Sequence, residues 1–498
     1  MRAFVPVVLA AFVNATMVAA AAQPLIPMTT GLPSAITSEL PDLGSAAQAA
    51  LPMSEQYQIG YSEAMQLREQ HQLLEDPEVS EYLNWIGKRL ASQSKMGGAD
   101  FHYLCVNTPV INSAAAPGGW IFINSGIILF TNTESELAAV MAHETAHVTQ
   151  MHIAREVLNQ QHQSVESIAT MLAAILLGAA GGGGGDAIMG GMVASQGLAA
   201  QEEIDYSRQV EEAADRVGMT YLAAAGFDPQ AMADIWEKMM RMSGVQDDWV
   251  PAVLQDHPID SVRIADARDR AAQYPPVPDT SSPDYYLIRA RVRVLTASSG
   301  EDLQRQYAER IARGDHRLGT MYGDALALME DNEAARAVPI LETLIRQHGE
   351  LHLLYSALGQ AEAKAGRMKQ ALATFRQAER LFPDNVPVTV RYAQTLMADG
   401  DNREAHALLL HLFDNVPPTP GEIALTARAA SASGDLADAY DYMGQYQLAY
   451  GNLPLAAEQF QLALTTPNIN QVQRERITEE LREVRNYLAS ARQQHESE

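Results

Sequence analysis

The chain has 498 residues, of which 47% are hydrophobic, and it carries a formal net charge of −26 at pH 7. This length predicts two or three globular domains, and the hydrophobic content excludes a chain that is disordered throughout. The acidic balance argues against nucleic acid as a partner, because nucleic-acid binding requires a basic face. Cys105 is the only cysteine, so the sequence excludes an intrachain disulfide and a cysteine-rich metal cluster.

The N-terminal residues have the pattern of an export signal. Arg2 precedes an apolar run over 3–13, and a short stretch of alanines follows. A basic start, an apolar centre and a small-residue cleavage site predict a signal peptide over 1–22, cleaved near Ala20–Ala22. An uncleaved membrane anchor is the alternative, since the stretch is just long enough to span a bilayer. Residues 23–52 show no clear periodicity and are expected to form a mobile lead-in.

Helix and strand patterns then follow one another. Asp76 and Pro77 predict the N-cap and first turn of a helix whose apolar residues recur on one face. The alternating segment 101–106 predicts a strand. A turn rich in helix breakers over 112–119 precedes a run of β-forming residues, 120–130, which predicts a second strand.

The predicted hairpin places an extended strand immediately before the segment with the metal-binding motif. A peptide substrate could pair its backbone with an edge strand there, the mode known as β-augmentation. Gly118, Gly119, Trp120 and Ile121 are therefore the candidate substrate-binding residues. An ordinary hairpin that packs on the following helix is an equally good interpretation of these residues.

The helix predicted after the hairpin carries the most specific motif of the chain. Thr133 followed by Glu136 predicts a capping box at its start. His143 and His147 are four residues apart, so both imidazoles leave the same face of the helix. With Glu144 they form an H-E-x-x-H motif, in which two histidines bind zinc and the carboxylate deprotonates a water molecule. The alternative is an amphipathic helix with two histidines at its surface or hydrogen-bonded in the core.

Residues 168–200 form two apolar arms around five consecutive glycines at 181–185. Each arm is too short to span a bilayer as a helix. The segment is interpreted as a lid over a cleft, a loop in peripheral contact with a membrane, or a surface for unfolded clients. A disordered insertion is the alternative.

A zinc site with two histidines from one helix needs a third protein ligand, and a carboxylate from a second helix suits it. Glu211 and Asp215 share a face of the next predicted helix, so Glu211 is a candidate ligand and Asp215 could support the site by hydrogen bonding. Both could instead be solvated acids. His152 is a weaker candidate for the third ligand. The metzincin pattern is excluded, because Gln150 and Ile153 stand where that pattern needs glycine and histidine.

A Pro-rich segment over 274–283 precedes a helical C-terminal part. Residues 352–385 match the 34-residue tetratricopeptide unit, and the pattern recurs one unit forward, one unit back and near residue 437. Small residues at closely packed positions let paired helices nest into a solenoid with a continuous core. We predict a linker and connecting helix over 273–316, then a partner-binding tetratricopeptide-repeat domain over 317–498. A generic helical bundle is the alternative.

The order and content of four segments resemble one known family. NSAAAPGGWIFINSGII, ELAAVMAHETAHV, YSRQVEEAADRVG and HPIDSVRIADA, followed by tetratricopeptide repeats behind an export signal, resemble the exported gluzincin peptidases of family M48. The resemblance covers the chain from about residue 53 to the C-terminus. It implies an α+β fold, with a mainly helical zincin-type metallopeptidase domain and a small β-sheet over 53–272, followed by an α-helical repeat solenoid.

The resemblance also implies roles for individual residues. His143, His147 and Glu211 would hold one zinc ion per chain, and Glu144 would act as the general base. Asp215 matches a position taken as an assisting catalytic acid.

His257 lies in a turn-like segment and would by itself be an ordinary exposed histidine. The resemblance implies that it can cover the metal in the resting enzyme as a regulatory fourth ligand, which would close an otherwise open catalytic site. Ala114 departs from the family pattern, which often has an aromatic residue there, so the wall of the substrate groove is expected to differ.

The expected function is that of a periplasmic zinc metalloendopeptidase that assists the assembly of outer-membrane β-barrel proteins and degrades stalled or misfolded precursors. The resemblance implies unfolded β-barrel proteins as substrates and the β-barrel assembly machinery as a partner of the repeats. The alternative is a repeat-based chaperone or assembly adaptor with a mainly structural or latent zinc site. A membrane-embedded prenyl-protein peptidase is excluded, because no apolar span of about 20 residues follows the signal.

Overall fold

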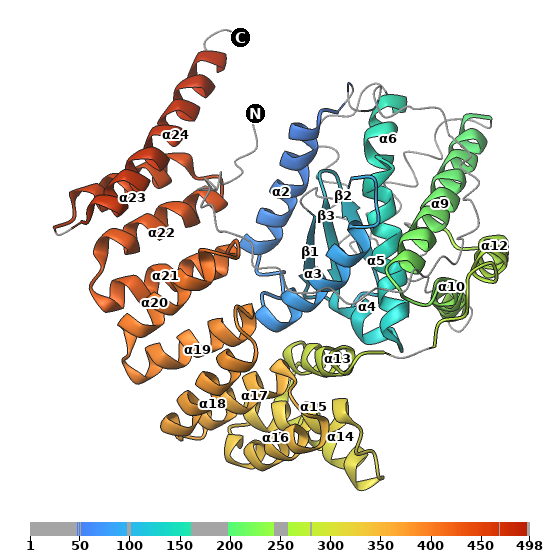
Figure 1. Cartoon of the computed structure of the whole chain (residues 1–498). Coiled ribbons are helices and arrows are strands. Elements are labelled where there is room, and N and C mark those ends of the chain that lie inside the picture. Colours follow the sequence, from blue (N-terminus) through green and yellow to red (C-terminus); the bar gives the residue numbers. More distant parts are fainter. Residues whose placement is uncertain are drawn as a thin grey trace, which may run out of the picture.

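The computed structural model describes residues 51–96, 101–160, 198–243, 257–278, 281–467 and 469–495, together with Ala47 and Ala49. Within them the chain forms a mainly helical N-terminal domain around a small sheet, followed by a long solenoid of helices (Figure 1). The predicted fold class is confirmed. The predicted signal peptide lies outside the described residues, as does most of the lead-in and of the segment 168–200. None of the described helices is long and apolar enough to cross a membrane.

The N-terminal domain packs its helices around a three-stranded sheet. Its elements are α2 (Met53–Glu69), α3 (Pro77–Ala91), β1 (His102–Val106), β2 (Ser113–Ala116), β3 (Trp120–Asn124), α4 (Ser125–Phe130), α5 (Glu134–Thr149), α6 (His152–Gln160), α9 (Leu198–Ala224), α10 (Gln230–Ser243) and α12 (Ser261–Ala271). Asp76 caps α3 as predicted, because its carboxylate accepts a hydrogen bond from the Val79 N–H at 3.2 Å.

The sheet has the strand order β1-β3-β2, with β3 parallel to β1 and antiparallel to β2. The strand predicted over 101–106 is confirmed as β1. The strand predicted over 120–130 is too long, because the chain turns into α4 after Asn124. Short apolar runs do not distinguish a buried strand from a buried helix. Gly126 permits this turn, since a Cβ there would collide with the carbonyl oxygen of Pro109.

The position of β3 differs from the predicted one, in which this strand lay at an edge of the sheet. Trp120 and Ile121 are buried on the central strand, whose two sides are already paired with β1 and β2. Gly118 lies in the turn before β3, with a φ of +79°, against the backbone of Tyr57 in α2. Within the described residues β1 and β2 form the two edges of the sheet, and β2, predicted as a turn, is the edge strand that contacts α5. Its three alanines carry no alternating pattern that would identify a strand.

Helix α5 lies at the centre of the N-terminal domain, in contact with α3, α9, α10 and the strands β2 and β3. Thr133 caps it by accepting a hydrogen bond from the Glu136 N–H at 3.1 Å. The Glu136 carboxylate accepts from Asn132 N–H instead of completing the predicted capping box on Thr133. The helix ends at Thr149, and Met151 adopts a φ of +53° before α6 begins.

The C-terminal part of the chain is a succession of antiparallel helices. They are α13 (Pro283–Leu295), α14 (Gly300–Ala312), α15 (Leu318–Glu330), α16 (Ala334–His348), α17 (His352–Lys364), α18 (Met368–Leu381), α19 (Val386–Asp399), α20 (Asn402–Phe413), α21 (Pro420–Ser433), α22 (Leu436–Ala449), α23 (Leu453–Thr465) and α24 (Gln471–His495). Helices α15, α17, α19 and α21 start at residues 318, 352, 386 and 420, so each step has the predicted 34 residues.

The unit predicted near residue 437 lies half a repeat out of phase with the others. Gly359 of α17 accommodates the ring of Phe375 in α18, and Gly444 of α22 accommodates Phe460 of α23 in the same way. Counting 34 residues on from the start of α19 gives the start of α21, whereas the second glycine–phenylalanine pair lies between α22 and α23. The predicted unit therefore corresponds to two helices that do pack together, α22 and α23, but the prediction did not include α21.

A buried charge cluster joins the two parts of the molecule. Asp76, the N-cap of α3, and Glu78 in its first turn face Arg291 of α13 and Arg391 of α19, with contacts of 2.7–3.1 Å. Glu78 also accepts a hydrogen bond from Ser356 Oγ of α17 at 2.8 Å. The repeats therefore pack along the N-terminal domain through α3, and Figure 1 shows them curving along its side.

Candidate metal centre

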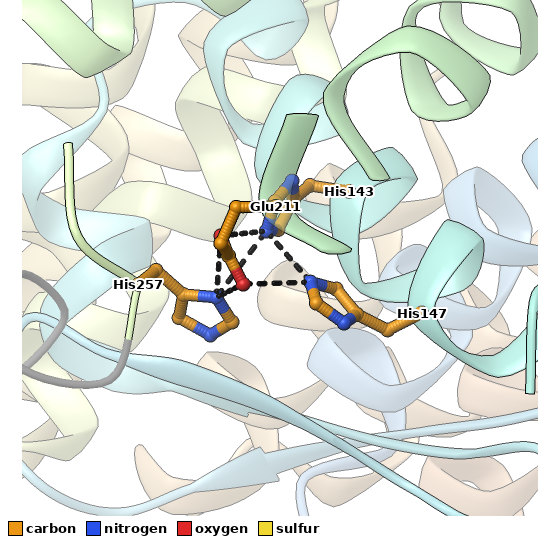
Figure 2. A group of neighbouring side chains, drawn as sticks. All are labelled: His143, His147, Glu211 and His257. Carbon is orange, nitrogen blue, oxygen red and sulfur yellow. Dashed lines mark hydrogen bonds and ion pairs between the residues drawn. The ribbon is translucent and has the colours of Figure 1, made fainter. Parts of the chain in front are cut away.

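Four side chains from three parts of the N-terminal domain converge on one point. His143 and His147 come from α5, Glu211 from α9, and His257 from the segment that precedes α12 (Figure 2). One potential ligand atom of each lies within 4.8 Å of those of the other three. The structure thus brings together the three predicted ligands and the predicted regulatory histidine, which are up to 114 residues apart.

The separations between these atoms fit a tetrahedral metal ion. The Glu211 carboxylate lies 3.3 Å from His143 Nε2 and 3.4 Å from His147 Nε2, and the two imidazole nitrogens are 3.0 Å apart. His257 Nδ1 lies 3.3 Å from His143 Nε2 and 3.1 Å from each Glu211 oxygen. Zinc–ligand bonds of about 2.0–2.1 Å place neighbouring ligands of a tetrahedron about 3.3–3.4 Å apart. The donor set and its spacing therefore fit zinc.

Burial and charge hold most of these groups in the forms that metal ligation requires. Burial keeps the pKa of His147 well below its usual value, so that its imidazole is neutral. Burial alone would raise the pKa of Glu211, but His257 and His147 lower it well below the usual range. Burial likewise opposes protonation of His143, yet hydrogen bonding to Asp215 and Glu211 raises its pKa to about 10. The excess of negative charge that attracts a proton there also attracts a cation.

Asp215 lies behind His143 and away from the centre of the cluster. Its Oδ1 is 3.0 Å from His143 Nδ1, the ring nitrogen that does not face Glu211. Arg263 donates to both oxygens of Asp215 at 2.8 and 2.9 Å, and Trp236 Nε1 donates to Oδ1 at 3.2 Å. This is a carboxylate–histidine arrangement of the kind that orients metal ligands.

The two carboxylate oxygens of Glu144 differ in their hydrogen bonding. Ser113 Oγ, at the start of β2, donates to Glu144 Oε1 at 2.7 Å. Glu144 Oε2 is buried and has no hydrogen-bond partner among the described residues. His257 Nε2 lies 3.6 Å from Oε1, so the carboxylate sits at the side of the cluster. A buried oxygen without a partner is suited to receive a proton.

His152, the weaker candidate for the third ligand, is not in the cluster. Its Nδ1 lies 3.0 Å from His147 Nδ1, on the far side of the ligand ring. Burial lowers the pKa of His152 to about 3, so the imidazole is neutral. His152 therefore contacts a predicted ligand without being one.

The sequence analysis missed the residues that surround the cluster. Arg263, Trp236 and Ser113 each contact a predicted site residue, yet none belongs to the H-E-x-x-H motif. Trp236 is buried, and its indole N–H also contacts Asp215. The only signal for Arg263 in the sequence is its position six residues after His257.

Comparison with known proteins matches the two parts of the chain to two families. Residues 77–271 match peptidase family M48, and residues 362–428 match the tetratricopeptide repeat. The chain is similar to the beta-barrel assembly-enhancing protease of Escherichia coli, with 32% identity over 85% of this chain and 88% of that protein. The protein of the same name from Yersinia pestis is 31% identical over 79% of this chain and 81% of its own length.

A second similarity covers a smaller share of the chain. The mitochondrial metalloendopeptidase OMA1 of Schizosaccharomyces pombe is 30% identical over 37% of this chain and 50% of that protein. Similarity to the bacterial proteins spans both the metal-site domain and the repeats, and the metal-site domain alone matches the peptidase family model. The chain therefore belongs to peptidase family M48, among the relatives of the beta-barrel assembly-enhancing proteases.

Proposed function

We propose that this protein is a zinc-dependent endopeptidase of the periplasm that assists outer-membrane β-barrel assembly and degrades stalled or misfolded precursors. Membership in a metallopeptidase family supports the reaction, and the names of its bacterial relatives support the substrate class. One observation carries the proposal. Two imidazoles and a remote carboxylate converge at tetrahedral separations beside a buried Glu144 oxygen that has no partner among the described residues.

In this proposal His143, His147 and Glu211 hold one zinc ion per chain. When bound, zinc lowers the pKa of a coordinated water molecule from about 15.7 to about 7 and polarises a carbonyl group. Glu144 Oε2 receives the proton and passes it to the leaving amine, and Ser113 keeps the carboxylate oriented by donating to its other oxygen. General acid–base catalysis of this kind contributes about 10²–10⁴-fold to the rate.

Asp215 is assigned a positioning role in place of the predicted role as an acid. Both of its oxygens accept hydrogen bonds from Arg263, and its Oδ1 faces His143. It therefore orients the His143 ring and stabilises the tautomer whose Nε2 lone pair faces the metal position.

The edge strand β2 is the proposed docking site for substrate. It begins at Ser113, the residue that contacts Glu144, so an extended peptide added to β2 would pass the reactive centre. A β-barrel precursor that has not closed presents unpaired strand edges, which suits this mode. The predicted substrate residues Gly118, Gly119, Trp120 and Ile121 would then support β2 from behind.

The position of His257 supports a resting state in which the proposed zinc site is closed to substrate. Its Nδ1 occupies the position of a fourth ligand, and four protein ligands are typical of closed structural zinc sites. This observation favours the second candidate function, a repeat-based chaperone or adaptor with a latent site. We propose that displacement of His257 opens the site, that the repeats engage the β-barrel assembly machinery, and that 168–200 makes peripheral membrane contact.

Cleavage of an unfolded β-barrel protein by wild type, Glu144→Gln and His257→Ala tests this function, with zinc content measured in each. Glu144→Gln should keep its zinc and lose cleavage, because the proton acceptor is removed. His257→Ala should keep its zinc and cleave faster. Normal turnover by Glu144→Gln contradicts the assigned base, and absence of cleavage by all three with zinc retained favours the chaperone function.

A further inference from the structure

A second group of potential metal ligands lies in the repeat domain, away from the site described above. His406 is on α20, Asp435 is the N-cap of α22, and Asp438 is in the first turn of α22. One donor atom from each lies within 4.8 Å of the other two. His406 and Asp438 are buried, and Asp435 is partly buried.

His406 has an imidazole nitrogen that the protein leaves without a hydrogen bond. The residue is 6% exposed, and its Nε2 is fully shielded and has no hydrogen-bond partner among the described residues. Asp438 Oδ2 is the nearest acceptor, at 3.4 Å. That separation is long for a hydrogen bond between an imidazole and a carboxylate, but it equals the edge of a tetrahedron around zinc.

The two carboxylates each have an oxygen that remains able to bind a cation. Arg476 of α24 donates to Asp438 Oδ1 at 2.8 Å and leaves Oδ2 facing His406. Asp435 Oδ1 accepts the capping bond from Asp438 N–H at 3.1 Å. Gln473 Nε2 donates to both Asp435 oxygens, at 3.2 and 3.0 Å, so Oδ2 has one neutral donor. Neither free position is blocked by a positive charge.

The surroundings carry more negative than positive charge. Arg476 donates to the carboxylates of both Asp438 and Asp441, and Glu480 lies close to Asp441. Burial and the charge of Asp441 raise the pKa of Glu480, so this carboxyl is neutral, and a single guanidinium faces two carboxylates, with Asp435 close to Asp438. A divalent cation would supply the missing charge.

We propose that His406, Asp435 and Asp438 form a second divalent-cation site, specific for zinc-like ions, that ties α20 to the start of α22. One imidazole and two carboxylates are ligands that zinc accepts, and water would complete the shell. Since Gln473 and Arg476 hold the same carboxylates, the ion also links these helices to α24. The site would fix the angle of the last helices of the solenoid, the surface that repeats use to bind partners.

Zinc binding by the full-length chain tests this site independently of the peptidase centre. The double variant His143→Ala/His147→Ala removes two ligands of the first site, and Asp435→Asn is then added to it. Asparagine is as good an N-cap as aspartate, so this change keeps the start of α22 and removes a charged ligand. His411→Ala, an exposed histidine of the same helix α20, is the matched control.

After dialysis against micromolar zinc, we expect two zinc ions per wild-type chain, one in the double variant, and none once Asp435→Asn is added. His411→Ala should leave the count unchanged. Zinc should raise the unfolding temperature of the double variant but not that of the variant that also carries Asp435→Asn. Absence of zinc from the double variant, or an ion in it that survives both Asp435→Asn and His406→Ala, overturns the proposal. Failure of the proposed peptidase would instead leave the Asp435-dependent ion in place.

Discussion

His143 and His147 each face the metal position with Nε2 and a protein partner with Nδ1. Asp215 Oδ1 lies 3.0 Å from His143 Nδ1, and His152 Nδ1 lies 3.0 Å from His147 Nδ1. In the proposed zinc site both imidazoles would carry their proton on Nδ1, which leaves the Nε2 lone pair for the metal. His152 can accept that hydrogen bond because burial keeps it neutral, with its pKa lowered to about 3.

The contact between His152 and His147 predicts an effect on metal affinity. We expect His152→Ala to weaken zinc binding by about 10–100-fold, the usual cost of losing a group that orients a ligand. Competition against a chelator of known affinity measures this, with circular dichroism to verify the fold. The exposed His348→Ala serves as the control and should bind zinc like wild type. Equal affinities in the two variants would show that His147 needs no such support.

At the scale of elements, glycines set how closely the repeat helices approach. A Cβ at Gly444 of α22 would lie 2.5 Å from the ring of Phe460 in α23, and Gly359 stands in the same relation to Phe375. Real Cβ atoms do not approach other atoms this closely, so the glycines are required by packing. The tetratricopeptide pattern identifies these positions in the sequence, because it places a small residue on one helix of a pair and an aromatic residue on the other.

Gly444→Ala is therefore expected to destabilise the repeat domain. Alanine gains about 1 kcal/mol of helix propensity, but forcing a methyl group against a packed ring costs about 1–3 kcal/mol. We expect a net loss of up to about 2 kcal/mol in the free energy of unfolding, measured by denaturant titration. Gly421→Ala in α21 is the control, because no atom lies within 4 Å of a Cβ there. A loss of stability from that control equal to the loss from Gly444→Ala would refute the packing argument.

At the scale of the whole molecule, a few buried charges decide how the two domains sit together. Arg391 contacts both Asp76 and Glu78 at 2.8 Å, and Arg291 contacts the same two carboxylates from α13. Burial alone would raise the pKa of Glu78, but Arg291 and Arg391 lower it well below its usual range. Helix α3 also packs against α5, so this cluster connects the repeats to the helix that carries His143 and His147.

Arg391→Ala should loosen the repeats from the N-terminal domain. Removing one partner of a buried ion pair leaves uncompensated charge and costs about 3–5 kcal/mol, measured here as free energy of unfolding. Arg482→Ala, which removes an exposed pair with Glu479, should change it by no more than about 0.5 kcal/mol. A similar effect of both substitutions would mean that the cluster does not hold the domains together.

The pH dependence provides a second readout of the same substitution. Because the folded-state pKa of Glu78 is lowered, its stabilisation is present above the ordinary value of 4.5 and is lost as the pH falls below it. The difference in stability between wild type and Arg391→Ala should therefore shrink from pH 6 toward pH 3.

The local features of this protein can be predicted from the order of its residues. Some features depend only on residues that are close in the sequence, so they can be recognised without the structure. They are the helical periodicity, the N-cap at Asp76 and the spacing of His143, Glu144 and His147. The 34-residue period is similarly local. The spacing of Glu211 and Asp215 made Glu211 a candidate ligand but did not separate it from a solvated helix acid. His257 could be proposed only through family resemblance, because nothing in the sequence next to it differs from an ordinary loop histidine.

Which distant groups meet depends on how the elements pack in three dimensions. The packing puts β3 in the middle of the sheet and β2 at one of its edges, contrary to the expectation that β3 is an edge strand. It also placed Arg263 on Asp215 and His152 behind His147. These contacts join residues on different elements, and they depend on how the elements pack. A local sequence pattern does not predict the distance between two such residues. That distance depends on burial and charge pairing across the whole fold.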